Sequence, residues 1–93
     1  MNDIEKRILE YVKELDKRHE TRSFHFSKGN KYYRVYWRFL SHNGHESGSE
    51  IVFCFIDMNG NIYKPEGWKR PAAGVRATLN NPVYTDGELY KRA

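Results

Sequence analysis

The chain has 93 residues, with 16 Lys or Arg, 12 Asp or Glu and 4 His, and a formal net charge of +4. A chain this short forms one domain that buries only about 60–65% of its unfolded surface, so we expect the chains to associate as a homo-oligomer. The 39% hydrophobic and 15% aromatic content excludes a disordered protein, and the single cysteine, Cys54, excludes a disulfide framework or a multi-cysteine zinc site.

The N-terminal segment predicts an amphipathic helix over residues 3–18. Its apolar residues recur at helical spacing on one stripe: Ile4, Ile8, Tyr11, Val12 and Leu15. Asn2 followed by Glu5 fits a capping box at the helix start. The charged residues on the opposite side are interpreted as a solvated face.

From Thr21 the apolar period changes to two, which predicts strands over residues 21–27 and 31–41 with a turn at 28–30. Side chains alternate across a strand, so the second strand presents two different faces. One face is the predicted core face, with Tyr33, Val35, Trp37 and Phe39. The other face is basic and aromatic, with Tyr32, Arg34, Tyr36 and Arg38.

Residues 41–49 are polar and rich in glycine, which indicates a loop. The almost continuous apolar run at 50–58 is typical of a central strand that is covered on both faces. Asn59-Gly60 favours a tight hairpin, so residues 61–64 should return antiparallel.

A short helix is predicted over residues 71–79, because Pro71 suits a first helical position and Asn80-Asn81-Pro82 ends the pattern. The sequence therefore predicts a single α+β domain with four parts. These are an N-terminal helix (1–20), a four-stranded antiparallel meander (21–64), a basic loop with a short C-terminal helix (65–80), and a tail (81–93). The tail has a turn at Asp86-Gly87 and apolar residues that could dock on the sheet or on a neighbouring chain.

The strongest functional signal lies between residues 60 and 76, where basic and aromatic residues surround the predicted helix start. The candidate ligand-binding residues are Tyr63, Lys64, Trp68, Lys69, Arg70 and Arg76. The unpaired N–H groups of residues 72–74 would bind a phosphate, with charge-assisted contacts from Arg or Lys, and Trp68 would stack on a base. The alternative is that Trp68 fills one end of the core while the basic residues face water.

The basic-aromatic strand face is a second candidate site. Flat rings and guanidinium groups interleaved in this way can stack bases and neutralise phosphates, so Tyr32, Arg34, Tyr36 and Arg38 form the alternative nucleic-acid face. The same residues could equally form an ordinary cross-strand ladder, covered by the first helix or by another subunit.

No metal site, cofactor or catalytic group is predicted. His42 and His45 have a spacing found in some metal sites, but a flexible glycine loop presets no tetrahedron and no third ligand can be named. The sequence contains no nucleophile elbow, zincin or phosphate-loop motif, and its carboxylates are scattered. We therefore expect a protein that is not an enzyme.

Four short motifs follow one another between residues 52 and 76: Val52-Phe53-Cys54-Phe55-Ile56-Asp57, Gly60-Asn61-Ile62-Tyr63-Lys64-Pro65, Trp68-Lys69-Arg70-Pro71-Ala72 and Val75-Arg76. This set resembles the motifs of a family of small, uncharacterised phage-encoded proteins. The resemblance covers about residues 32 to 80. It implies a phage setting and an accessory role in host takeover or in evading host defence, and it implies no reaction.

Together these features predict a non-enzymatic phage protein that sequesters a nucleotide or another phosphorylated small molecule to counter host defence. The first alternative is a nucleic-acid-binding module that uses the strand face. The second is a protein–protein inhibitor of a host defence enzyme, anchored by exposed aromatic residues such as Tyr36 and Trp37. No signal peptide or membrane-spanning stretch is apparent, which predicts a location in the cytoplasm of the bacterial host without membrane contact.

Overall fold

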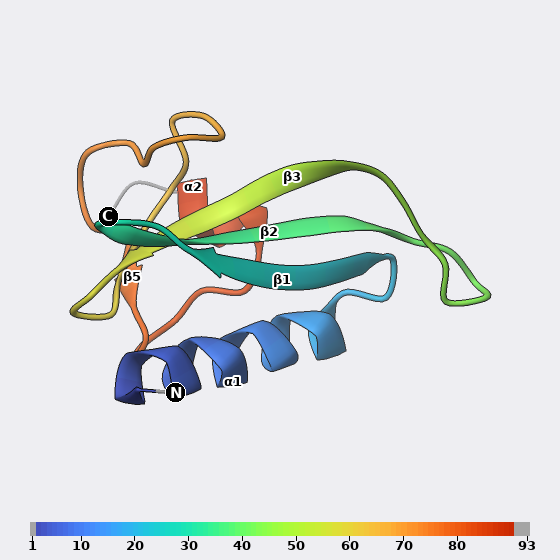
Figure 1. Ribbon diagram of the computed structural model, residues 1–93, viewed down its shortest axis with the longest axis horizontal. Helices are drawn as coiled ribbons and strands as arrows, with labels where there is room; N and C mark the ends of the chain where they lie inside the picture. The colour runs from blue at the N-terminus through green and yellow to red at the C-terminus, as the bar shows by residue number, and fades with distance from the viewer. Residues whose placement is uncertain (1, 91–93) are drawn as a thin grey trace.

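The structure is a computed structural model that describes residues 2–90; residues 91–93 of the predicted tail lie outside the described residues, as does Met1. The elements are α1 (Asp3–Arg18), β1 (Arg22–Lys28), β2 (Tyr32–Leu40), β3 (Glu46–Asp57), β4 (Asn61–Tyr63), β5 (Ala77–Thr78) and α2 (Asp86–Tyr90). The strands form one antiparallel sheet in the order β1-β2-β3-β4-β5 (Figure 1). The predicted α+β class is confirmed, with five strands in place of four.

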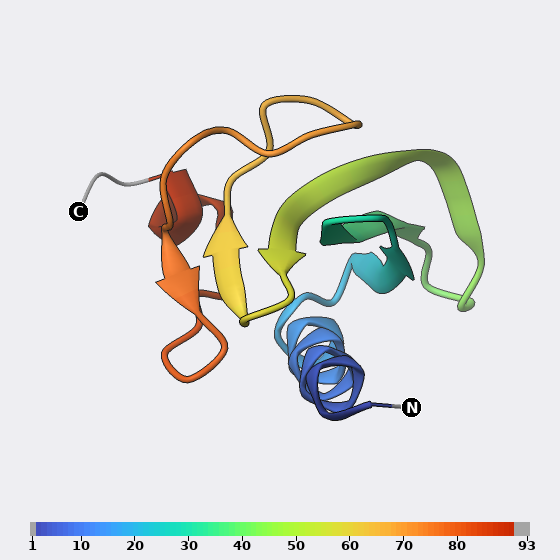
Figure 2. The same cartoon turned by 60° about the vertical axis from the view of Figure 1, so that its left-hand side comes forward.

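Helix α1 has the predicted bounds and packs its apolar stripe against one face of the sheet (Figures 1 and 2). Four stripe residues are buried: Ile8, Tyr11, Val12 and Leu15. The Asn2 side chain accepts a hydrogen bond of 2.8 Å from the Glu5 N–H, which satisfies one of the unpaired donors at the helix start. The helix therefore covers the sheet as the sequence pattern indicates.

The alternation of β2 follows the prediction along most of the strand. Tyr33, Val35 and Trp37 are buried in the core beneath α1, whereas the residues between them are half-buried on the opposite face. Phe39 is an exception, because its ring is 52% exposed where β2 runs beyond the helix. One face of the sheet thus packs in the core against α1, and the opposite face can be contacted by other segments of the chain.

The predicted loop at residues 41–49 is shorter in the structure, because β3 already begins at Glu46. Phe39 pairs with Ser47 and Trp37 pairs with Ile51, so the extra residues of β3 form a bulge between these pairs. Gly48 lies in this bulge with a φ of 85°, a conformation that glycine adopts without steric cost. The polar composition that predicted a loop belongs instead to an exposed, bulged hairpin.

The prediction of a helix over residues 71–79 is wrong, because the structure has no helix there. The Ala72 N–H donates to the Lys64 carbonyl at 2.9 Å, and the Arg76 N–H donates to the Ile62 carbonyl at 2.7 Å. The segment therefore runs beside β4 and forms the edge strand β5, because pairing with β4 satisfies N–H groups that the first turn of a short helix would leave unpaired. The C-terminal helix of the fold is α2, within the predicted tail.

The described part of the tail docks on the core of its own chain. Leu89, in α2, is fully buried in the core cluster, and Val83 and Tyr84 pack against that cluster. The Tyr11 hydroxyl donates a 2.6 Å hydrogen bond to the Val83 carbonyl, which links the tail to α1. The sequence left open whether the tail packs on its own sheet or on a neighbouring chain. The structure shows the tail packed on the core of its own chain.

Strand β1 lies at one edge of the sheet, and a side chain from α1 occupies part of that edge. The Phe24 N–H donates a 2.7 Å hydrogen bond to Asp16 Oδ1. We expect Asp16→Ala to lower the free energy of unfolding by about 1 kcal/mol, the typical net contribution of such a bond. Asp16→Asn keeps an acceptor oxygen and should retain most of the stability. Urea unfolding of the two variants measures the difference, and equal losses would show that the hydrogen bond contributes nothing.

Candidate functional site

The loop formed by residues 64–76 crosses the sheet face opposite α1, as Figure 2 shows. It thereby brings the two candidate sites of the sequence together. Arg34 Nε donates a 2.8 Å hydrogen bond to the Trp68 carbonyl, and the Arg34 guanidinium carbon lies 4.5 Å from the centre of the indole. Tyr36 also packs against this ring in an edge-type arrangement, with 5.7 Å between the ring centroids. Trp68 and the basic-aromatic strand face therefore belong to one site.

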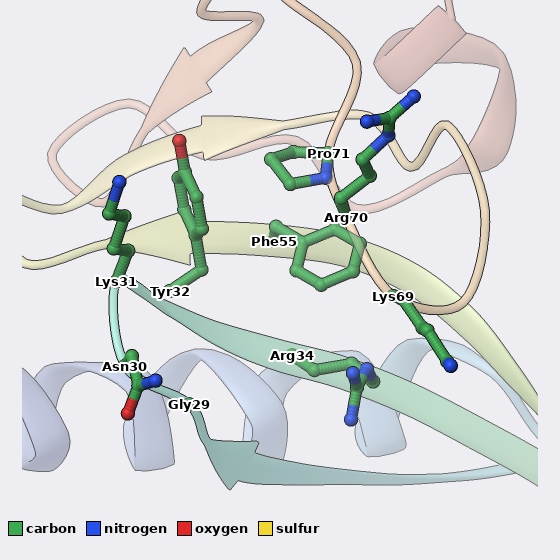
Figure 3. A pocket seen from close by; sticks show the side chains of 9 residues that line it. All are labelled: Gly29, Asn30, Lys31, Tyr32, Arg34, Phe55, Lys69, Arg70 and Pro71. Atoms are coloured by element: carbon green, nitrogen blue, oxygen red, sulfur yellow. The ribbon is translucent and has the colours of Figure 1, made fainter.

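A groove with a volume of about 360 Å³ opens where this loop meets the start of β2 (Figure 3). It is lined by Gly29, Asn30, Lys31, Tyr32, Arg34, Phe55, Lys69, Arg70 and Pro71. Figure 3 places the Phe55 ring between Arg34 on one side and Arg70 with Pro71 on the other, with Tyr32 and Lys31 at one end. Among residues 2–90, the lining combines four cationic side chains with two aromatic rings and contains no carboxylate.

The cationic side chains of the groove form few and weak ion pairs with the rest of the described residues. Arg70 Nε lies 2.9 Å from Glu66 Oε2, but both side chains are more than half exposed, and such pairs contribute little. Arg34 is held by its Nε bond to the Trp68 carbonyl and pairs with no carboxylate of residues 2–90. Lys31 and Lys69 form no ion pair among residues 2–90. An incoming anion would therefore compete with Glu66 for Arg70, but it would meet three other cations that form no ion pair with residues 2–90.

A hydrogen-bond network behind the groove fixes one of its walls. Tyr32 packs edge-on against Tyr63, with ring centroids 5.6 Å apart, and the Tyr63 hydroxyl donates a 2.8 Å bond to Asp57. This bond raises the pKa of the Tyr63 hydroxyl. Partial burial acts to raise the pKa of Asp57, but hydrogen bonds from Asn61, Tyr63 and Asn59 outweigh it and hold that pKa below its ordinary value of 3.8.

The lowered pKa of Asp57 predicts a contribution to acid sensitivity. A carboxyl with a depressed folded-state pKa stabilises the protein fully above its ordinary value of 3.8, and this stabilisation is lost as the pH falls through the lower folded-state pKa. We expect the free energy of unfolding to decrease across this acid range, and to decrease less steeply in Asp57→Asn. Urea titrations at a series of acid pH values measure both slopes. Identical slopes would contradict the assignment.

The predicted ligand-binding residues do not all meet at this groove. Lys69 and Arg70 line it, and Tyr63 supports it through Tyr32. Lys64 and Arg76 instead contact Tyr90: Lys64 Nζ lies 5.6 Å from that ring, and Arg76 Nη1 donates to the Tyr90 carbonyl at 3.4 Å. The predicted anion site at the N–H groups of residues 72–74 is wrong, because the chain forms no helix there and the Ala72 N–H is already bonded.

The structure also bears on the alternative interpretations of Trp68, of the nucleic-acid face and of the inhibitor interface. Trp68 is 37% exposed and lies outside the core cluster, so it does not fill one end of the core. On the nucleic-acid face, Tyr32 and Arg34 line the groove, Tyr36 lies between Trp68 and His25, and Arg38 pairs with Glu50. Trp37 is only 7% exposed, so it is not the exposed interface anchor that the inhibitor hypothesis required.

No pattern in the sequence indicated Lys31 and Phe55 as groove residues. Lys31 directly follows the Gly29-Asn30 turn, and this position at a strand start could have indicated a side chain beside Tyr32. Phe55 was assigned only to an apolar strand, although its place between core residues Cys54 and Ile56 puts it on the opposite sheet face. Its ring is 3% exposed and packs near Tyr32, with the centroids 6.3 Å apart.

Other kinds of site find no support in the described residues. Within residues 2–90, no three His, Cys, Asp or Glu side chains come close enough to hold a metal ion. His25 contacts Glu46 at 2.8 Å and Ser23 at 3.2 Å, an arrangement on the exposed hairpin away from the groove lining. No helix in the described part of the chain is long and apolar enough to cross a membrane.

Comparison with known proteins gave one match. No curated protein and no solved structure matched the chain. The model of a family of unknown function, DUF7717, matches residues 1–93, which is the whole length of the chain. The protein with this cationic groove therefore belongs to the DUF7717 family.

Proposed function

We propose that the protein is a non-enzymatic binding protein that holds the phosphate group of a nucleotide in the groove between β2 and the 64–76 loop. The observation that supports this most directly is the charge of the lining. Four cations line the groove, and no carboxylate in the described part of the chain does; the cations are Lys31, Arg34, Lys69 and Arg70. Charge-assisted hydrogen bonds from Arg and Lys are among the strongest contacts that a protein offers to phosphate.

The size and the rings of the groove favour a nucleotide over a bare anion. Small-molecule sites typically have volumes of about 300–1,000 Å³, and this groove, at about 360 Å³, lies at the lower end of that range. Tyr32 is a half-buried wall, and a flat base packed against an aromatic ring gains about 1–3 kcal/mol. The base would thus use the aromatic wall while the phosphate meets the cations.

The biological use that we propose is sequestration of a nucleotide signal in the cytoplasm of a bacterial host. This step is supported by the motif resemblance to phage-encoded proteins and by the small size of the chain. It requires binding without turnover, which agrees with a groove lined by cations and aromatic rings rather than by an arrangement of nucleophile and base.

Calorimetry tests the proposal directly. The ligands are AMP, ADP, ATP, adenosine and inorganic phosphate, each titrated at low and at high salt. We expect the nucleotides to bind more tightly than either adenosine or inorganic phosphate, and their affinity to fall with salt because phosphate contacts are screened. Absence of heat with every nucleotide, or equal affinity for adenosine and AMP, would overturn the proposal.

Removal of the competing carboxylate should strengthen binding. Glu66→Gln frees Arg70 from its exposed ion pair, whose contribution is about 0.2–1 kcal/mol. We therefore expect nucleotide affinity to rise by about 1.5- to 5-fold. Glu10→Gln on α1 makes the same change in net charge away from the groove and serves as the matched control. Equal gains in both variants would indicate a general charge effect and not release of Arg70.

A further inference from the structure

A second hollow adjoins the groove and shares part of its lining. It has a volume of about 450 Å³ and is lined by Glu66, Gly67, Trp68, Lys69 and Arg70. Lys69 and Arg70 line both hollows. The two spaces therefore meet at a pair of cations, with Tyr32 and Phe55 on one side and the exposed Trp68 indole on the other.

We propose that this double site takes two nucleosides joined by a phosphodiester, and this inference rests on the proposed function. One nucleotide occupies the groove beside Tyr32, the linking phosphate lies at Lys69 and Arg70, and the second base packs on the Trp68 indole. The ligand class is thus a dinucleotide unit, whether it belongs to a linear single strand or to a cyclic dinucleotide.

The chemistry of the two hollows differs in the way this assignment requires. The groove is lined by no carboxylate of the described residues and suits phosphate oxygens, whereas Glu66 lines the second hollow and makes it less favourable for another anion. Trp68, a residue that is 37% exposed and lines this hollow, instead offers a flat indole to an uncharged base. The second hollow is therefore assigned to a base and the boundary between the hollows to the phosphate.

Trp68 is held in place before any ligand arrives. The N–H groups of Glu66 and Gly67 donate to the Arg70 carbonyl at 3.1 and 3.3 Å, which closes the loop into a tight turn. Arg34 on β2 holds the same loop. Its Nε donates to the Trp68 carbonyl, and its guanidinium carbon lies 4.5 Å from the indole centre. A ring fixed in this way loses little conformational freedom when a base stacks on it.

The inference is tested by calorimetry with three probes: AMP, the linear dinucleotide pApA, and its cyclic counterpart with two phosphodiester links. We expect at least one dinucleotide to bind about tenfold or more tightly than AMP, the gain typical of one stacked base. Trp68→Ala should abolish this gain, so that the dinucleotides bind this variant no more tightly than AMP binds the same variant, and Trp68→Phe should keep most of the gain. Comparison of the affinities for the linear and the cyclic dinucleotide identifies which of the two ligand types the site prefers.

The controls separate the inference from the proposed function. Circular dichroism and urea unfolding establish that the Trp68 variants keep the fold, and Trp68→Phe retains a ring if the alanine variant loosens the loop. If AMP binds and both dinucleotides bind no more tightly, the two-base site is wrong and the proposed function stands. If Trp68→Ala leaves the dinucleotide gain intact, the second hollow is not the base site. If no probe binds, both proposals fail.

Discussion

Replacement of Arg34 by glutamine is expected to lower nucleotide affinity by about 10- to 100-fold. Hydrogen bonds to charged groups contribute about 1.5–3 kcal/mol, and Arg34 lines the groove while its Nε also holds the Trp68 carbonyl. The substitution therefore removes a phosphate contact and loosens the loop that supplies Lys69 and Arg70. Calorimetry with AMP or ADP measures the loss.

Arg38→Gln is the matched control for this experiment. Arg38 is four residues further along β2 on the same face, but its guanidinium pairs with Glu50 and does not line the groove. The two variants have the same change in net charge, so a purely electrostatic attraction would weaken equally in both. We expect Arg38→Gln to change affinity by less than about threefold, since exposed charges some distance away act weakly through screening solvent. Equal losses would rule out the groove as the phosphate site.

The largest effect on stability is expected for Ile56→Ala. Ile56 is fully buried in β3 and belongs to the core cluster beneath α1. Truncation of a buried isoleucine to alanine costs about 2–5 kcal/mol, a large share of the roughly 5–14 kcal/mol expected for a domain of this length. Urea unfolding should show a much lower midpoint with an unchanged slope.

Ile51→Ala tests whether burial accounts for that loss. Ile51 has the same side chain on the same strand, but it is 39% exposed on the bulged hairpin. The same truncation there should cost less than about 1 kcal/mol, because little apolar surface leaves the core. A comparable loss at both positions would mean that strand propensity, rather than the core beneath α1, determines the stability of β3.

Local sequence patterns predicted the elements whose stability depends mainly on their own spacing. The stripe of α1 and the alternation of β2 each repeat over several turns or residue pairs, so their buried faces could be assigned without knowledge of their partners. The segment at 71–79 lacked such a repeat, and the helix assignment there relied on Pro71 and Pro82 alone. Pairing of β5 with β4, together with a φ of 97° at Gly74, is a tertiary preference that no local pattern indicates.

In the candidate site, too, the sequence indicated the features that depend on local composition and did not indicate those that depend on tertiary contacts. The sequence indicated the basic character of both segments, and Lys69, Arg70, Tyr32 and Arg34 do line the groove. It did not indicate that Arg34 and Trp68 make contact, because residues 34 positions apart meet only through the path of the loop. Lys64 and Arg76 were included on proximity in sequence, but they lie beside Tyr90, since the neighbouring backbone of residues 62–64 and 72–76 is paired.

The contact between Asp16 and the Phe24 N–H bears on how copies of this chain can assemble. An open strand edge is a template on which another chain can extend the sheet, and in fibrils this addition repeats without limit. At the β1 edge, a carboxylate already occupies one of the donors that an added strand would need. A homo-oligomer of this protein should therefore form through side-chain surfaces rather than by a continuous intermolecular sheet across β1.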